Sequence, residues 1–343
     1  MAARRKVKPK EDEETNDYFA PEGRANFFHS GCTLLDCVLG GGWPLGRVSN
    51  VVGDKAVGKT LLAIEAAANF SIQYPKGVVW YREAEAAFDE HYAATLGLPL
   101  DRVDFGSEGI GTQWDTIEDI FEDLSLCIRS AKDEKRPGLY IVDSLDALSS
   151  RAELERPIEA GSFKLEKQKV LGELFRRMTR ALRDADIHVM IISQVRDKIG
   201  VVFGEKHTRS GGKALDFYAS QILWLSNLGV ISKQKKGAKR PVAVRVKAKC
   251  KKNKIGLPFR ECEFVIRFGY GIEDLLANLE WLGEVKKLDK LGLTKDTVDK
   301  WFAETEALPK PDYDKRCEAV RAGVREAWEE IEAEFLPKRR KYE

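Results

Sequence analysis

A glycine-rich segment from residue 53 to residue 60 has the residue types and spacing that bind a phosphate chain. It reads Gly53-Asp54-Lys55-Ala56-Val57-Gly58-Lys59-Thr60 and fits the pattern G-x-x-x-x-G-K-[ST] without a mismatch. The glycines let successive backbone N–H groups point at phosphate oxygens, and a helix that starts here adds the positive end of its dipole. Lys59 supplies a charge for the β- and γ-phosphates, and the Thr60 hydroxyl is a ligand for Mg²⁺. The segment therefore predicts a site for ATP and Mg²⁺.

Acidic residues follow two of the apolar runs that we expect to be strands. The run 139–142 ends in Asp143, and the carboxyl ends of strands form the ligand-binding edge of an open α/β sheet. We expect Asp143 to hold Mg²⁺ together with Thr60. Glu83 and Glu85 follow the run 77–81 at the same edge. One of them must position the attacking water; we favour Glu85 and expect Glu83 to be a solvated loop charge.

The elements that must position these residues follow an α/β pattern. Short apolar runs alternate with amphipathic stretches from residue 29 onward, which predicts a mostly parallel central sheet flanked by helices. The expected buried strands are 48–52, 77–81, 139–142, 189–192 and 222–225, and helices are expected at 60–70 and 170–183. After Gly237 apolar residues alternate with polar ones, which predicts two antiparallel strands at the sheet edge with the cationic stretch 247–254 between them.

Three regions differ in composition. Residues 1–28 are polar and charged and predict a largely flexible N-terminal arm. Residues 29–271 form the expected ATPase core. Residues 272–343 predict a small helical C-terminal domain, with helices at 273–282, 294–305 and 313–335, and end in a basic tail for which a solvated terminus is favoured over a DNA contact.

The overall composition limits the class of protein. The chain has 343 residues, 43% of them apolar, and a formal net charge of +2, which neither requires nor excludes a nucleic-acid partner. The six cysteines show no C-x-x-C pair and no histidines at zinc spacing, so free thiols are expected. No apolar run approaches the ~20 residues that span a bilayer, and no secretory signal is present. We therefore expect a cytoplasmic protein with no membrane partner.

Four further segments follow one another in a recognisable order. They are Glu83-Ala84-Glu85 with Asp89, Tyr92 and Leu96-Gly97, residues 143–148 followed by 152–155, residues 192–204 followed by 208–220, and Lys252-Asn253-Lys254-Ile255 before Pro258-Phe259. Together with the phosphate loop, these segments resemble the RecA family of bacterial DNA recombinases over about residues 29 to 272. The match at 196–220 is long enough to separate the chain from other P-loop ATPases. The resemblance implies a RecA-like P-loop NTPase core.

The resemblance also implies roles at the nucleotide. Glu85 activates the water, and Gln194 senses the γ-phosphate and couples it to the loop 195–210. Asp89 and Tyr92 contact the adenine. Lys252 and Lys254 reach the nucleotide of the neighbouring subunit, so that ATP lies between protomers of a filament or ring.

A second group of residues is expected to contact DNA. The resemblance assigns the DNA backbone to Arg176, Arg196, Lys198, Gly211 and Gly212, and it makes Ile199 a wedge between base steps. Arg209 and Lys213 add charge to the same glycine-containing loop, which can follow a phosphate backbone without reading sequence. The alternative is a flexible surface loop with scattered charge.

The chain departs from the family pattern at several points. Residues 1–28 do not read as the helix that docks on the adjacent subunit, and residues 155–163 share little with the first DNA loop, where Phe163 is either a stacking residue or a hydrophobic anchor. Asp197 and Asp216 replace an apolar residue and a lysine. The short arm suggests a phage- or plasmid-encoded relative.

Three functions remain open on this basis. The first is a DNA-dependent ATPase that coats single strands and pairs them with homologous duplex in recombination and repair. The second is a RecA-fold motor or helicase-like ring. The third is an ATP-gated DNA-binding accessory protein without strand exchange.

Overall fold

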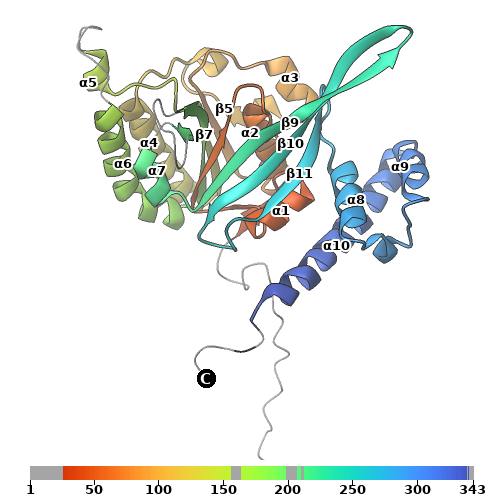
Figure 1. The fold of residues 1–343 in the computed structure, drawn as a ribbon. Coiled ribbons are helices and arrows are strands. Elements are labelled where there is room, and N and C mark those ends of the chain that lie inside the picture. The colour runs from red at the N-terminus through yellow and green to blue at the C-terminus, as the bar shows by residue number, and fades with distance from the viewer. Residues whose placement is uncertain (1–25, 156–163, 198–206, 210–211, 338, 340–343) are drawn as a thin grey trace, which may run out of the picture.

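The computed structural model describes residues 26–155, 164–197, 207–209, 212–337 and 339, and a ten-stranded sheet runs through their centre (Figure 1). Its strands are β3 (Val48–Gly53), β4 (Val78–Glu83), β5 (Val103–Asp104), β6 (Gly138–Asp143), β7 (Ile187–Asp197), β8 (His207–Arg209), β9 (Gln221–Lys235), β10 (Ala238–Asn253), β11 (Glu261–Arg267) and β12 (Gly271–Ile272). The order across the sheet is β12-β11-β10-β9-β3-β7-β6-β4-β5, and β8 pairs with β7. The strands from β9 to β5 are parallel, whereas β10, β11 and β12 pair antiparallel. This confirms the predicted α/β class and the antiparallel edge.

Helices cover both faces of the sheet. They are α1 (Thr33–Leu39), α2 (Lys59–Gln73), α3 (Glu90–Thr95), α4 (Ile117–Glu134), α5 (Arg151–Leu154), α6 (Lys164–Asp184) and α7 (Gly212–Tyr218), with 3₁₀ turns at Leu100–Arg102 and Gly109–Gly111. Alternate residues of a strand point to opposite faces. Leu139 and Ile141 of β6 therefore join the hydrophobic cluster under α1 and α2, while Tyr140 and Val142 join the one under α4, α6 and α7.

The N-terminal boundary of the folded part lies earlier than predicted. Phe27 and Phe28, which the prediction placed in the flexible arm, form β1 (Phe27–Phe28) and pair with β2 (Trp43–Pro44). Phe28 is completely buried and contacts Phe70 of α2 edge to face. The aromatic pair gives the segment enough apolar surface to join the core. The remainder of the predicted arm, residues 1–25, lies outside the described residues.

Two features of the antiparallel edge differ from the prediction. The expected short strand 222–225 is the start of the 15-residue β9, which forms a long hairpin with β10. Most of the cationic stretch 247–254, expected between two strands, belongs to β10 itself, because its residues alternate: Ala248 and Cys250 are buried, whereas Lys247 and Lys249 are half-exposed.

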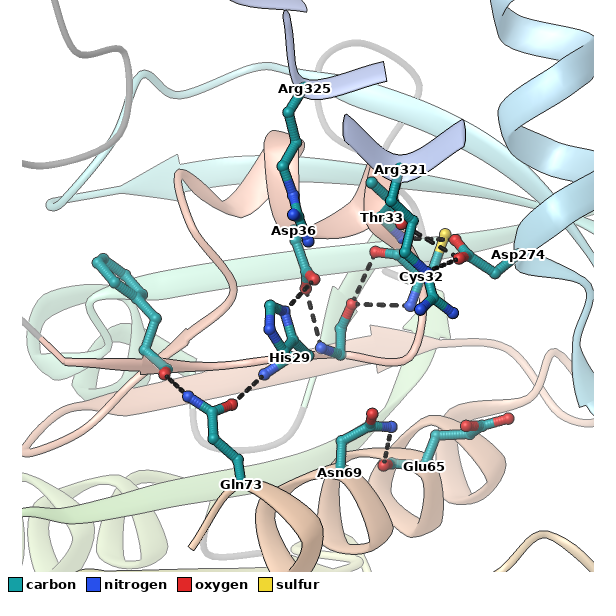
Figure 2. A network of polar contacts seen from close by, with 12 residues as sticks. His29, Cys32, Thr33, Asp36, Glu65, Asn69, Gln73, Asp274, Arg321 and Arg325 are labelled. Carbon is teal, nitrogen blue, oxygen red and sulfur yellow. Dashed lines mark hydrogen bonds and ion pairs between the residues drawn. The ribbon is translucent and has the colours of Figure 1, made fainter. Parts of the chain in front are cut away.

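The C-terminal helices pack against the sheet rather than apart from it. They are α8 (Asp274–Glu284), α9 (Val298–Glu306) and α10 (Lys310–Phe335), with a 3₁₀ turn at Leu288–Leu291. Figure 2 shows the polar side of this contact: the Thr33 N–H donates to Asp274 Oδ1 at 2.7 Å, and Arg321 Nε donates to Oδ2 at 2.9 Å. None of the helices in the described part of the chain is long and apolar enough to cross a membrane.

Candidate functional site

The phosphate loop joins β3 to α2, as its pattern requires, and its two glycines are needed for different reasons. Gly58 has a φ of 93°, a conformation that residues with a Cβ adopt at a cost, and an added Cβ would come within 2.4 Å of Ile266 Cδ1. A Cβ at Gly53 would come within 2.6 Å of Val57 Cγ1. The loop therefore curls only because both positions lack a side chain.

Lys59 begins α2 and points back into its own loop. Its side-chain ammonium donates to the Asp54 carbonyl at 2.7 Å, and the residue is only 9% exposed. Burial lowers the pKa of Lys59, while the charges of Asp143, Glu85 and Asp54 act in the opposite direction. Because a buried ammonium is costly without a counter-charge, the loop provides a place where an anionic ligand is stabilised.

Asp143 ends β6 beside the start of α2. Its carboxylate accepts a hydrogen bond from the Tyr81 hydroxyl at 2.8 Å and another from the Thr60 side chain, and it is 5% exposed. Burial raises the pKa of Asp143 to about 6, and the hydrogen bonds from Thr60 and Tyr81 oppose this shift. A carboxylate and a hydroxyl held together in this way fit Mg²⁺, which prefers oxygen ligands and relieves the buried charge.

Glu83 and Glu85 lie close in sequence but their carboxylates have different partners. The Glu83 carboxylate accepts from the backbone N–H groups of Glu85 at 2.8 Å and Ala87 at 3.3 Å, so it holds the turn after β4. The Glu85 carboxylate accepts from the Ser144 hydroxyl and from Gln194 Nε2 at 3.0 Å. Only Glu85 of the two lines the cavity next to the phosphate loop.

That cavity has a volume of about 600 Å³, within the usual range for ligand pockets. Its walls are formed by Lys55, Ala56, Val57, Gly58, Lys59, Thr60, Leu61, Glu85, Tyr92, Asp143, Gln194, Val244, Ile266 and Phe268. The polar end holds the phosphate loop, and Tyr92 and Phe268 give the cavity an aromatic part suited to a base. Asp89, the other predicted adenine contact, is not in this wall; its carboxylate caps α3 by accepting from the Tyr92 N–H at 2.9 Å.

Val244, Ile266 and Phe268 were not predicted as site residues. The alternation at 262–268 was visible in the sequence, but it predicted only a strand. β11 lies over the phosphate loop because of the order of the strands across the sheet. A local sequence pattern does not predict this order.

Lys252 and Lys254 do not line the cavity of their own chain. The Lys252 ammonium donates to the carbonyls of Asp216 and Phe217, and Lys254 Nζ donates to the Phe217 carbonyl at 2.9 Å. Burial and the neighbouring charge of Lys254 lower the pKa of Lys252 to about 8. The two ammonium groups are thus held close together at the end of β10, where an anion from outside the chain would stabilise them.

The predicted DNA contacts are only partly described. Arg176 on α6 and Lys213 on α7 are exposed, and Gly212 begins α7 with a φ of 42°. Arg209 is 7% exposed, and its guanidinium donates to the Asp216 carboxylate at 2.5 Å, so its charge is paired. Arg196 lies in β7, where its backbone pairs with Thr208. Lys198, Ile199 and Gly211 lie outside the described residues, as does Phe163.

Comparisons with known proteins agree on one family. Residues 21–273 match the family model described as the RecA N-terminal domain. Protein RecA of Arthrospira platensis is 33% identical over 305 residues, which cover 86% of this chain and 79% of the relative. Protein RecA of Synechococcus sp. (strain CC9902) is 36% identical over 291 residues, which cover 81% of this chain and 73% of the relative. These relatives give no support to a phage or plasmid origin, and they do not favour the motor or accessory alternatives. The chain belongs to the RecA family.

Proposed function

We propose that this protein is a DNA-dependent ATPase that binds single-stranded DNA as an ATP-gated filament and promotes homologous pairing and strand exchange. The observation that carries the proposal is the arrangement of one cavity. Lys59 and the phosphate loop lie at its polar end, the Thr60–Asp143 pair lies beside them, and Glu85 faces the same space while bonded to Gln194. Proteins named RecA at 33–36% identity over most of the chain support the same function.

Each of these side chains has a task in hydrolysis. Thr60 and Asp143 would hold Mg²⁺, which would supply positive charge to neutralise the phosphates. Lys59 and the loop N–H groups hold the phosphate chain, and Glu85 orients a water and accepts its proton. As the water oxygen bonds to the γ-phosphorus, the bond to the β–γ bridging oxygen breaks and ADP leaves with that electron pair.

Gln194 is proposed to sense the γ-phosphate of the nucleotide. Its side-chain amide donates to Glu85, and its backbone N–H donates to the Asp146 carboxylate at 2.7 Å. In the proposed cycle the γ-phosphate competes with Glu85 for this amide. Because Gln194 lies in β7, immediately before the segment assigned to DNA, a change of its partner moves that segment.

Self-association completes the proposed site. Lys252 and Lys254 of one subunit would contact the phosphates bound by the next, so that ATP joins protomers of a filament or ring. The exposed cations Arg176 and Lys213, with Arg196, Lys198, Ile199, Gly211 and Gly212, would contact the DNA. Arg209 is proposed to hold α7 through Asp216 rather than to contact DNA, since its charge is buried and paired.

ATP hydrolysis measured with and without single-stranded DNA tests the proposal, with Lys59→Ala as the control. We expect strong stimulation by DNA in the unaltered protein. We expect the variant to lose hydrolysis by roughly 10²-fold or more, because the ammonium that holds the phosphates is gone. Hydrolysis that is indifferent to DNA would refute the coupling through Gln194 and with it the recombinase function.

A further inference from the structure

The hairpin of β9 and β10 extends beyond the body of the molecule (Figure 1). The two strands pair from Gln221–Asn253 to Lys235–Ala238 and close in a two-residue turn, Lys236-Gly237, with φ values of 49° and 80°. Positive φ at both positions is typical of the type I′ turns that suit twisted ribbons. Residues 226–241 are exposed apart from the half-buried Ile231. We call residues 232–241 the hairpin tip.

The hairpin tip carries positive charge that the fold does not neutralise. No acidic residue occurs between Asp216 and Glu261, whereas that interval holds twelve lysines and arginines. Cations near the base of the hairpin are paired: Arg245 with Glu280, Lys247 and Lys249 with Glu261, and Arg260 with Glu332. The tip cations are Lys233, Lys235, Lys236, Lys239 and Arg240, and none forms an ion pair within the described residues.

The positions of these cations add repulsion to the ribbon. Lys233 and Arg240 are directly opposite each other across the strand pair, and Lys235 lies on the same face two residues further. Like charges opposite each other destabilise a strand pair, and a two-stranded ribbon alone is only marginally stable. Burial raises the pKa of Glu273, and the charge of Lys233 is a minor influence that opposes this shift; the ion-pair partner of Glu273 is Arg267 rather than Lys233. Folding of the chain therefore does not explain these residues, whereas an anionic partner does.

We propose that the hairpin tip binds the phosphate backbone of duplex DNA. A two-stranded ribbon fits the major groove, and cations on exposed strands neutralise phosphates without reading the base sequence. Single-stranded binding sites use aromatic side chains on which bases stack, and residues 226–241 contain no aromatic residue. The tip thus favours duplex over a single strand.

This inference rests on the proposed function, because it assigns the incoming duplex of a pairing reaction to a surface separate from the segment 196–213. It also predicts that duplex binding at the hairpin tip depends on salt concentration. Lysines and arginines that meet phosphates release counterions, so their contribution depends steeply on salt.

Two variants with equal charge change test the proposal. The first is Lys233→Gln, Lys235→Gln, Lys239→Gln and Arg240→Gln together. The matched control is Lys76→Gln, Lys132→Gln, Lys295→Gln and Lys300→Gln, which neutralises four exposed lysines elsewhere. Binding of a labelled duplex and of a labelled single strand is measured at several salt concentrations with a slowly hydrolysed ATP analogue.

We expect the hairpin variant to bind duplex roughly tenfold or more weakly than the control. The slope of log affinity against log salt should fall in magnitude by about 3.6, because four phosphate contacts each contribute about 0.9. Single-strand affinity and DNA-stimulated hydrolysis should match the control, and thermal stability should not fall, since repulsion is removed.

Two results would overturn the inference. One is duplex binding equal to that of the control. The other is that the hairpin variant no longer self-associates and also no longer binds either duplex or single-stranded DNA. That result would make the tip a contact with an acidic protein surface on a second copy. A failure of the proposed function would give a different result: single-stranded DNA would not stimulate ATP hydrolysis by the unaltered protein. The difference in duplex affinity between the two variants would still decide the role of the hairpin tip.

Discussion

Glu83 and Glu85 are two glutamates that the fold uses differently, and this difference is testable. The Glu83 carboxylate holds a backbone turn, whereas the Glu85 carboxylate faces the cavity between Ser144 and Gln194. We expect Glu85→Gln to lower kcat for ATP hydrolysis by about 10²–10⁴-fold, because an amide oxygen cannot take the proton of the attacking water. ATP affinity should remain, since the phosphate loop is untouched. Steady-state kinetics and equilibrium binding of a fluorescent ATP analogue measure the two effects.

Glu83→Gln is the matched control. Its amide oxygen still accepts a backbone hydrogen bond, so hydrolysis should fall by less than tenfold. If Glu83→Gln abolished hydrolysis while Glu85→Gln kept it, the assignment of the two carboxylates would be reversed.

At the residue scale, the sequence is informative where the chemistry is local. The residues of the phosphate loop are consecutive, so their spacing predicts their joint position on the turn before α2. Arg209 shows the opposite case. Its ion pair with Asp216 depends on how β8 meets α7, and the sequence pattern suggested a cation free for DNA. Phe268 was missed for the same reason, since it enters the cavity from the turn after β11, which is distant in sequence from the phosphate loop.

At the element scale, His188 links the central strand β7 to the small N-terminal sheet. Its ring is completely buried, its Nδ1 lies 2.7 Å from the Pro44 carbonyl oxygen of β2, and it contacts Phe28 of β1 edge to face. Nδ1 therefore carries the hydrogen and donates to that oxygen. Burial lowers the pKa of His188 from 6.5 to about 4, and the hydrogen bond to Pro44 opposes the shift.

This shift predicts acid sensitivity. Because the unfolded chain binds the proton more tightly, stability is lost as pH falls from about 6.5 to about 4. The loss from this one group should reach about 2 kcal/mol at pH 5. Urea unfolding at pH 7.5 and pH 5, for the unaltered protein and for His188→Gln, measures it.

The comparison with the His188→Gln variant is essential because another buried group changes stability with pH in the opposite direction. Burial raises the pKa of Glu65 to about 7, so its contribution is present at low pH and is lost as pH rises toward 7. Only the difference between the two proteins isolates the imidazole. An equal pH slope in both proteins would mean that His188 does not titrate as proposed.

Elements were predicted more completely in the parallel part of the sheet than at its edge. Buried central strands read as continuous apolar runs, so five of them were found. The outer half of β9 is mostly exposed, including its apolar residues Leu228 and Val230, and its register depends on pairing with β10 rather than on burial. Its length was therefore missed, and with it the hairpin tip.

At the scale of the whole molecule, the predicted boundary between core and C-terminal helices falls inside one hydrophobic cluster. Leu275, Val320 and Trp328 belong to the same cluster as the residues of α1 and α2. The Asp274 carboxylate adds bonds to Thr33 of α1 and to Arg321 of α10 (Figure 2). The division at residue 272 stays a prediction, and the shared cluster argues that both parts unfold together.

Trp328→Ala tests this cooperation. Trp328 is 6% exposed and lies with its ring centre 5.5 Å from that of Trp281, so its removal should cost about 3–5 kcal/mol. If the sheet and the C-terminal helices form one unit, the variant should lose its helical circular dichroism signal and its nucleotide binding in the same transition. That transition should occur at a lower urea concentration than in the unaltered protein. Phe335→Ala is the control on the same helix, since Phe335 is 78% exposed and should change stability by less than about 0.5 kcal/mol. Two separate transitions, with nucleotide binding surviving the first, would instead show that residues 272–343 form an independent domain, because the sheet would then stay folded without α10.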